Sequence, residues 1–264
     1  MNRDFKIGLV VISLFLIWGA VYSIFMNTPE LDIAMELIKP LGKGPLLGTD
    51  IYGRSVFSII SAGISYSLQV AVMVTLLSIL IGVIIGFLST SHYKIIAVFM
   101  DLLINVNFVF PSILIAILVM SIMGQSSVGL ILTLALTNWS GHAKITRVEV
   151  VRIKAMAFYE SAIVLGVGPI RIFLTTIMPM ILPLIIVNGV LGLSGVIVSE
   201  SILGFLGLGG SSYSWGSMLA MGKNILLEAP HIAIIISGIM ALMIIGLNLL
   251  GDGLRDILDP KTSN

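Results

Sequence analysis

Residues 144–179 read KITRVEVVRIKAMAFYESAIVLGVGPIRIFLTTIMP and form the longest polar interruption in an otherwise apolar chain. The stretch carries five of the fourteen Lys and Arg residues and lies between two long apolar runs. A cluster of cations between apolar runs is typical of a loop that joins two membrane spans. We therefore interpret the rest of the sequence outward from this loop.

The composition predicts an integral membrane protein. Of its 264 residues, 58% are hydrophobic and 10% are charged, and soluble domains typically carry about 25% charged residues. The net charge of +1 comes without a long basic run, so no nucleic-acid partner is expected. The absence of Cys excludes disulfides and thiolate metal sites. No GxxxxGK[ST] loop is present, so any ATP that drives this protein must be bound by another chain.

The apolar runs predict six membrane-spanning helices in a single all-α membrane domain, 1–264. We divide it into a first span with an external loop, 1–54, and a core, 55–264. The spans are expected at residues 7–27, 68–88, 95–123, 128–140, 181–199 and 231–250. The Ser- and Gly-rich segment 55–67 fits either an interfacial helix or a partly inserted one. Pro111 removes a backbone hydrogen bond inside the third span and is predicted to kink it.

The distribution of Lys and Arg predicts the orientation of the chain. Six spans place ten of these residues on the side of both termini and of the 144–179 loop, and four on the other side. Cytoplasmic loops carry the excess of positive charge in membrane proteins. Both termini and the 144–179 loop are therefore expected in the cytoplasm.

Two interpretations of the cationic loop are open on charge alone. It can set topology and meet anionic lipid head groups, or it can form a short helix that binds in a groove of a partner protein. Residues 157–164 can form such a helix, and Gly166 can end it in a tight turn. Topology needs only a few cations, so the defined spacing of Glu160, Gly166 and Pro179 favours the partner-binding helix.

The sequence Glu160-Ser161-Ala162, followed by Gly166, Ile177 and Pro179, resembles a known signature. In permease subunits of bacterial ABC importers, the signature is Glu-Ala-Ala, three residues and Gly, with Ile and Pro further on. This chain departs from the signature at two positions. Ser161 stands where the second residue of the signature is usually Ala, and Met178 stands where Leu is common before the Pro. The resemblance implies a cytoplasmic coupling helix that contacts an ATPase subunit, through the residues Tyr159, Glu160, Ser161, Ala162, Gly166 and Pro179.

Three further stretches resemble the dipeptide, oligopeptide and nickel branch of that family. They are LGTDIYGR at 47–54, GFLGLG at 204–209 with SWGSML at 214–219, and NLLGDGLRD at 248–256 before Asp259-Pro260. Ser55 replaces a usual Asp, and Gly204 a usual Ser. The resemblance covers residues 46–261 and implies a six-span type I importer permease, in the second, C-type position of its branch.

The resemblance also implies the partners and the substrate class. A second, homologous permease would form a heterodimer with this chain in the bacterial cytoplasmic (inner) membrane. Two ATPase subunits would bind ATP and Mg, and an extracytoplasmic solute-binding protein would deliver the solute. This chain would be a transport subunit without catalytic residues or cofactors. Di- and oligopeptides are the expected substrates, with nickel or a metal chelate as the alternative.

Asn107, Pro111, Glu200 and Trp215 are the candidates for a solute pathway or an external loop. We expect Glu200 to be an interfacial acid near a span end, because a charge at mid-membrane costs roughly 2.5–3.5 kcal/mol or more. The alternative makes it a polar group at the outer mouth of the pathway. The glycines of 204–210 are not followed by Lys or preceded by a strand, which argues against a phosphate loop. We expect them in a loop that contacts the external binding protein.

Two other kinds of function were weighed. His92, His142 and His231 lie in different segments without ligand spacing, so no metal site is predicted in this chain. A secondary transporter or channel that works without ATPases would be expected to show paired half-helices and a pair of acids at mid-membrane. The sequence shows neither pattern, so the permease interpretation is preferred.

Overall fold

The computed structural model describes residues 3–25, 31–42 and 44–258, and within them the chain is helical without any named β-strand. This confirms the predicted all-α fold. Some residues used in the sequence analysis lie outside the described residues. These are Lys43 and Lys261, which were counted for the orientation, and the Asp259-Pro260 pair of the C-terminal motif. The elements are α1 (Arg3–Phe25), the 3-10 turn η1 (Ile33–Met35), α2 (Val56–Leu88), α3 (Lys94–Val109), α4 (Ser112–Met123), α5 (Ser127–Lys154), α6 (Ala157–Val164), α7 (Pro169–Ile172), the π-helical stretch η2 (Phe173–Ile177), α8 (Met178–Phe205), α9 (Trp215–Asn224) and α10 (Pro230–Leu258).

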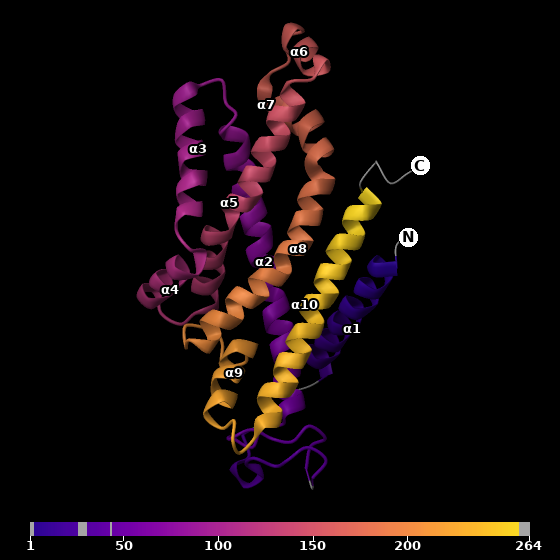
Figure 1. Ribbon diagram of the computed structural model, residues 1–264, viewed down its shortest axis with the longest axis vertical. Helices are drawn as coiled ribbons and strands as arrows, with labels where there is room; N and C mark the ends of the chain where they lie inside the picture. The colour runs from indigo at the N-terminus through magenta and orange to yellow at the C-terminus, as the bar shows by residue number, and fades with distance from the viewer. Residues whose placement is uncertain (1–2, 26–30, 43, 259–264) are drawn as a thin grey trace.

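The long helices run roughly along one axis of the molecule (Figure 1). The short helix α6 lies at one end of this axis, and the segment between α1 and α2 lies at the opposite end. Helix α2 contacts α1, α5 and α8, while α1 also packs along α10. The arrangement therefore has two distinct ends, which we call the α6 end and the outer end.

The structure supports a multi-pass membrane protein. Four helical stretches are long and apolar enough to cross a membrane: α1, α2, the continuous stretch 169–205 and α10. The bent pair of α3 and α4 makes a fifth if the two helices form one span. The remaining predicted span falls on α5, whose first 17 residues, 127–143, are uncharged and whose second half is charged. The sixth membrane span, which would be formed by α5, therefore stays a prediction.

Helix α2 decides between the two alternatives for residues 55–67. Residues 56–88 form a single helix of 33 residues, about 50 Å long at about 1.5 Å per residue. No turn separates the Ser- and Gly-rich segment from the apolar part. Ile60, Ile64 and Ser67 in that segment are buried in the core. A separate interfacial helix at 55–67 is thus excluded, because its apolar residues are used for packing inside the protein.

The predicted kink at Pro111 is confirmed, and it is a complete break. The axes of α3 and α4 differ by 90°. Phe110, the residue before the proline, is extended with φ −95° and ψ 135°. A residue that precedes proline is pushed out of the helical region by the proline ring, which explains the position of the break.

The polar loop begins later than predicted. Helix α5 continues through Lys144 and ends only at Lys154, so the first 11 residues of the predicted loop are helical. No Gly or Pro interrupts residues 142–154. The Arg152 guanidinium binds the Glu149 carboxylate at 2.7 Å, a spacing of three residues that supports a helix. The charged residues thus extend the span beyond the apolar region instead of ending it.

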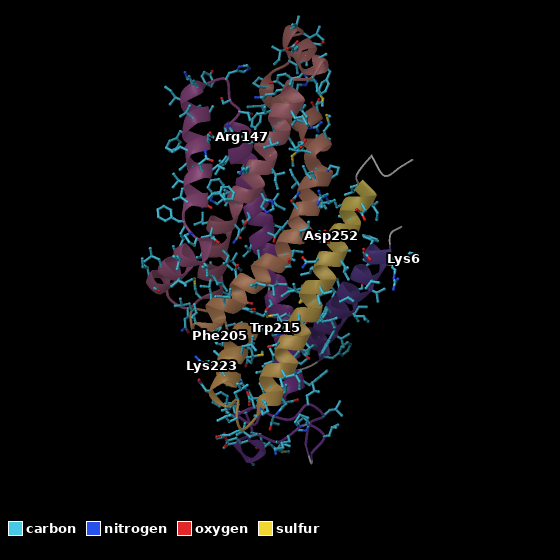
Figure 2. The ribbon with its side chains drawn as sticks, in the orientation of Figure 1. Lys6, Arg147, Phe205, Trp215, Lys223 and Asp252 are labelled. Atoms are coloured by element: carbon cyan, nitrogen blue, oxygen red, sulfur yellow. The ribbon has the colours of Figure 1, made fainter. Side chains whose placement is uncertain are left out.

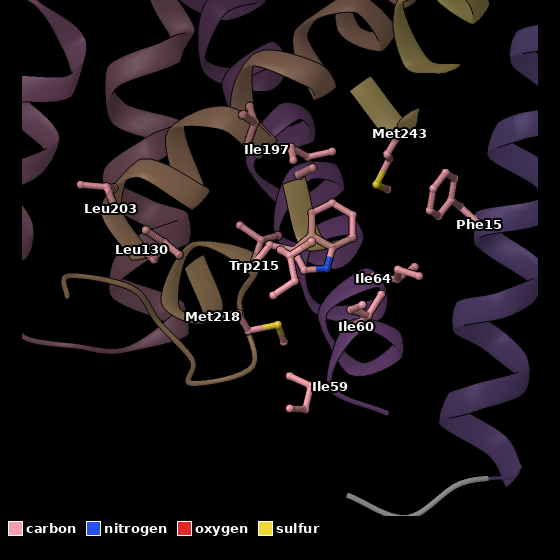
Figure 3. Packing of buried hydrophobic residues seen from close by; sticks show 14 of the residues in the cluster. Phe15, Ile59, Ile60, Ile64, Leu130, Ile197, Leu203, Trp215, Met218 and Met243 are labelled. Carbon is pink, nitrogen blue, oxygen red and sulfur yellow. The ribbon is translucent and has the colours of Figure 1, made fainter. Parts of the chain in front are cut away.

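The core is centred on Trp215 at the start of α9, which is fully buried (Figure 3). It packs against α2 at Gly63, where an added Cβ would lie 2.6 Å from the indole Cδ1 and Nε1. Near the other end of α2, a Cβ at Gly86 would lie 2.5 Å from the Ala143 carbonyl oxygen of α5. Small residues allow this close approach of membrane helices. Glycines of α2 therefore position both α5 and α9.

The substitution Gly63→Ala is expected to destabilise the protein by about 1–3 kcal/mol, because the new methyl group overlaps the Trp215 ring. Thermal unfolding of the purified protein in detergent measures the loss as a lower midpoint. Gly238→Ala in α10 is the matched control, since its Cβ would meet no atom within 4 Å. Equal midpoints for the two variants would contradict the packing described.

Candidate functional site

The predicted short helix and turn are present at the α6 end. Helix α6 spans residues 157–164, and Gly166 has a φ of +79°. The Val167 N–H donates to the Ala162 carbonyl at 3.0 Å, and the Gly166 N–H donates to the Ile163 carbonyl at 2.9 Å. These two bonds close the helix in the manner of a Schellman motif, which requires the left-handed conformation that glycine adopts easily. The turn explains the glycine of the signature.

Tyr159 anchors α6 to the rest of the protein. Its side chain is 7% exposed and belongs to a hydrophobic cluster with residues of α2, α5, α7 and α8. Burial raises the pKa of its hydroxyl group above the usual value. The sequence interpretation had placed Tyr159 among the residues that contact a partner. The structure turns it inward, so its role is to hold the helix in place.

The outward surface of α6 combines polar and apolar side chains. Glu160 and Ser161 are exposed, and Ala162 is partly buried. Val164 and Leu165 are 86% and 81% exposed. We call Val164 and Leu165, together with the exposed Ile170 of α7, the apolar tip. The sequence predicts that such a helix binds a partner through its apolar positions, but it does not single out Val164, Leu165 or Ile170.

A lysine joins the base of α6 to the end of α2. The Lys154 ammonium group donates to the Thr90 hydroxyl at 3.0 Å and also to the Thr90 carbonyl. The same group lies 6.0 Å from the centre of the Tyr159 ring. Partial burial lowers the pKa of Lys154. The last residue of α5 is thus fixed between the C-terminus of α2 and the buried face of α6.

A second connection runs from α2 to the start of α8. The rings of Phe87 and Phe173 stack with centroids 4.0 Å apart. Phe173 opens the π-helical stretch, in which the Met178 N–H donates to the Phe173 carbonyl. Pro179 follows in the first turn of α8 and is exposed. Because Pro179 has no N–H and its ring crowds the carbonyl four residues earlier, a wider turn before it is favoured.

At the outer end, Glu200 is fully buried, which overturns the expectation of an interfacial acid. One carboxylate oxygen accepts hydrogen bonds from Ser67 of α2 at 3.1 Å and from Ser201 at 3.4 Å. The other oxygen has no partner among the described residues. Ser67 of the distant helix α2 and the neighbouring Ser201 take the place of water around the acid, so it is not a group at an open outer mouth.

The other candidates of the outer half have separate positions. Trp215 is a core residue and not a surface contact of an external loop. Asn107 is partly buried on α3, and Pro111 is exposed at the break after it. The glycine-rich segment is tied down, since the Ser127 hydroxyl donates to the Gly210 carbonyl at 2.9 Å. The structure therefore does not gather Asn107, Pro111, Glu200 and Trp215 into one site.

The fold and the α6 end define a class: a helical multi-pass membrane protein that presents a short, partly apolar helix beyond its apolar spans (Figure 2). Residues 78–264 match the family described as binding-protein-dependent transport system inner membrane component. The chain belongs to this family of transport permeases. It is therefore a transport subunit by family, as the signature predicted.

Relatives with known names agree with the family. The chain is 29% identical to a dipeptide transport system permease protein, DppC, of Alkalihalophilus pseudofirmus, over 98% of this chain and 86% of the relative. It is 33% identical to a glutathione transport system permease protein, GsiD, of Escherichia coli, over 97% and 84%. A solved structure of an amino acid ABC transporter with histidines matches with a TM-score of 0.56 and 18% identity, over 76% of this chain and 94% of that one. This last match supports the fold.

Replacing Gly166 by Ala is expected to loosen the end of α6, because a left-handed backbone costs a residue with a Cβ about 1–2 kcal/mol. Hydrogen exchange of residues 157–167 should become faster by about 5- to 30-fold. Gly168→Ala is the matched control, since Gly168 has an ordinary φ of −65° and open space around it. Unchanged exchange in the Gly166 variant would contradict the turn.

Proposed function

We propose that this chain is one of two different permease subunits of an ATP-driven importer of di- and oligopeptides. The observation that carries the proposal is the apolar tip beside Glu160 on α6. Exposed apolar side chains outside a membrane mark a protein-binding surface. The chain has no loop for a nucleotide triphosphate, so the tip is suited to receive work from a separate ATPase. ATP and Mg would be bound by two such ATPase subunits.

The α6 end offers a physical route for that work. In this proposal Glu160, Ser161 and the apolar tip contact the ATPase, while Gly166 and Pro179 shape the chain behind them. Tyr159 links the helix to the hydrophobic cluster beneath it. The Lys154–Thr90 contact and the Phe87–Phe173 stack then join this cluster to α2. A shift of α6 would therefore displace α2, α5 and α8 together as packed bodies.

The proposed orientation places the α6 end in the cytoplasm of a bacterium, with the chain in the inner membrane. The ten-to-four distribution of Lys and Arg supports this side. Helix α1 begins and α10 ends nearer to α6 than to the outer end, which supports cytoplasmic termini (Figure 1). An extracytoplasmic binding protein would deliver the solute at the outer end.

The names of the relatives support a peptide substrate, while the partner in a heterodimer, a second, homologous permease, is proposed from the resemblance of the signature motifs alone. Dipeptides and glutathione, named in two relatives, are both short peptides. Among the residues the structure describes, no three His, Asp or Glu side chains form a group that could hold a metal ion. No observation in this chain therefore favours the nickel or metal-chelate alternative over peptides.

Leu165→Glu is expected to release the ATPase subunits, because a charge at the apolar tip cannot be desolvated in an apolar groove. Affinity purification of this chain from cells that express its neighbouring subunits measures their retention. Leu165→Met keeps the apolar surface and should retain the ATPases. Full retention in the Leu165→Glu variant would exclude the tip as the docking surface.

Uptake by the complete importer tests the function itself. Proteoliposomes that contain this chain, its partner permease, the ATPases and the binding protein should accumulate a labelled dipeptide only when ATP is supplied. The variant Gly166→Trp should lower uptake, since it disturbs the turn behind α6. Dipeptide uptake without ATP, or none with it, would contradict the proposed importer.

A further inference from the structure

One face of α8 has an unusual surface for a membrane span. Gly195 is exposed, and Asn188 and Ser199 are partly exposed at the same depth as apolar neighbours. To one side of this face, the Ser194 hydroxyl donates to the Asn248 side-chain oxygen of α10 at 3.0 Å. Polar groups in spans normally face a partner or a water-filled cavity and not lipid. This face therefore belongs to the interior of an assembled transporter.

A cleft of about 410 Å³ opens at the end of this face nearest to α6. Its walls come from α5, α8 and α10, with Val148, Asn188 and Leu191 among the lining residues. Lys144 of α5 and Arg255 of α10 supply the two cations of the cleft. We call it the inner vestibule. It combines apolar walls with two basic side chains from separate helices.

Within residues 3–25, 31–42 and 44–258, neither cation of the inner vestibule, Lys144 or Arg255, is neutralised by an ion pair. The Lys144 ammonium group lies 5.2 Å over the Phe108 ring of α3, which does not line the vestibule, so this flexible side chain would turn from the ring to bind an anion in the vestibule. Glu149 also lines the vestibule, but its carboxylate is bound by Arg152 at 2.7 and 2.8 Å. An anion is the missing partner.

We propose that the inner vestibule binds the C-terminal carboxylate of the transported peptide before its release, an inference that rests on the proposed function. Lys144 and Arg255 would hold the carboxylate. The Asn188 amide nitrogen donates to the Leu184 carbonyl at 2.8 Å, which leaves its oxygen to accept a peptide N–H. Both cations are accessible to water, so the contact is weak and suits release into the cytoplasm.

The same charges would attract an anionic lipid head group, but the surface beyond the vestibule argues against it. An acyl chain that continued along α8 would meet Gly195 and Ser199 instead of an apolar groove. A peptide carries polar backbone groups that match Asn188 and the Ser194–Asn248 pair. The chemistry of the face therefore favours the peptide.

The absence of Cys in the natural chain allows a direct test on the complete importer in inside-out vesicles. Val148→Cys is treated with an anionic sulfonatoethyl or a cationic trimethylammonium methanethiosulfonate reagent, and labelling of this chain is followed by mass. The rate of each reagent at Val148→Cys is divided by its rate with a free thiol in solution. This normalised rate should be about 10-fold higher for the anionic reagent than for the cationic one. The Lys144→Gln, Arg255→Gln background should remove this preference. The background Lys94→Gln, which removes an exposed cation of α3 outside the vestibule, should preserve it.

Protection by peptides identifies the bound group. A dipeptide with a free C-terminal carboxylate should slow the anionic reagent at Val148→Cys, and the same dipeptide with an amidated C-terminus should not. Equal reaction of the two reagents, equal protection by the two peptides, or no reaction because lipid or the second permease covers the site would each overturn the proposal. A charge preference and selective protection in an importer that fails to take up dipeptides would contradict the proposed function alone.

Discussion

The close approach of α2 and α5 is the constraint on which the rest of the structure depends. A Cβ added at Gly82 of α2 would lie 2.7 Å from the Trp139 carbonyl oxygen of α5. A Cβ added at Gly86 would lie 2.5 Å from the Ala143 carbonyl oxygen. The two backbones therefore touch over more than a turn, and this pair has the most extensive contact of any two helices. Helix packing in a membrane relies on such contacts, because apolar association gains little from leaving lipid. The α2–α5 pair is the frame to which α8, α9 and α6 attach.

The two ends of this frame are held by different chemistry. At the outer end, Trp215 fills the space over Gly63, and Glu200 binds a serine of α2. At the α6 end, an aromatic stack and one lysine join α2 to the elements that follow α5. The outer end is thus a closed core, while the α6 end has few, specific connections. Few connections make α6 suited to transmit a displacement without unfolding the spans.

The sequence predicts the class and the α6 end well, because the relevant signals are local. Apolar runs give the helices, and the distance from Glu160 to Gly166 marks a helix and its turn. Pro111 acts on its own neighbours, so its break is foreseeable. Glu200, in contrast, is buried because Ser67, more than 130 residues earlier, faces it. The same limit applies to Trp215, to the charged extension of α5 and to which apolar residues of α6 face outward, because all three depend on tertiary packing.

The apolar tip also has a consequence for the life of the chain before assembly. A newly made copy shows Val164 and Leu165 to water at more than four-fifths exposure. Such a surface promotes self-association and recognition by quality-control proteases. An excess copy without its ATPase would therefore be removed, and the level of this subunit would follow the supply of its partners. If α6 couples the subunit to an ATPase as proposed, the same helix would also act as the signal that balances the stoichiometry of the complex.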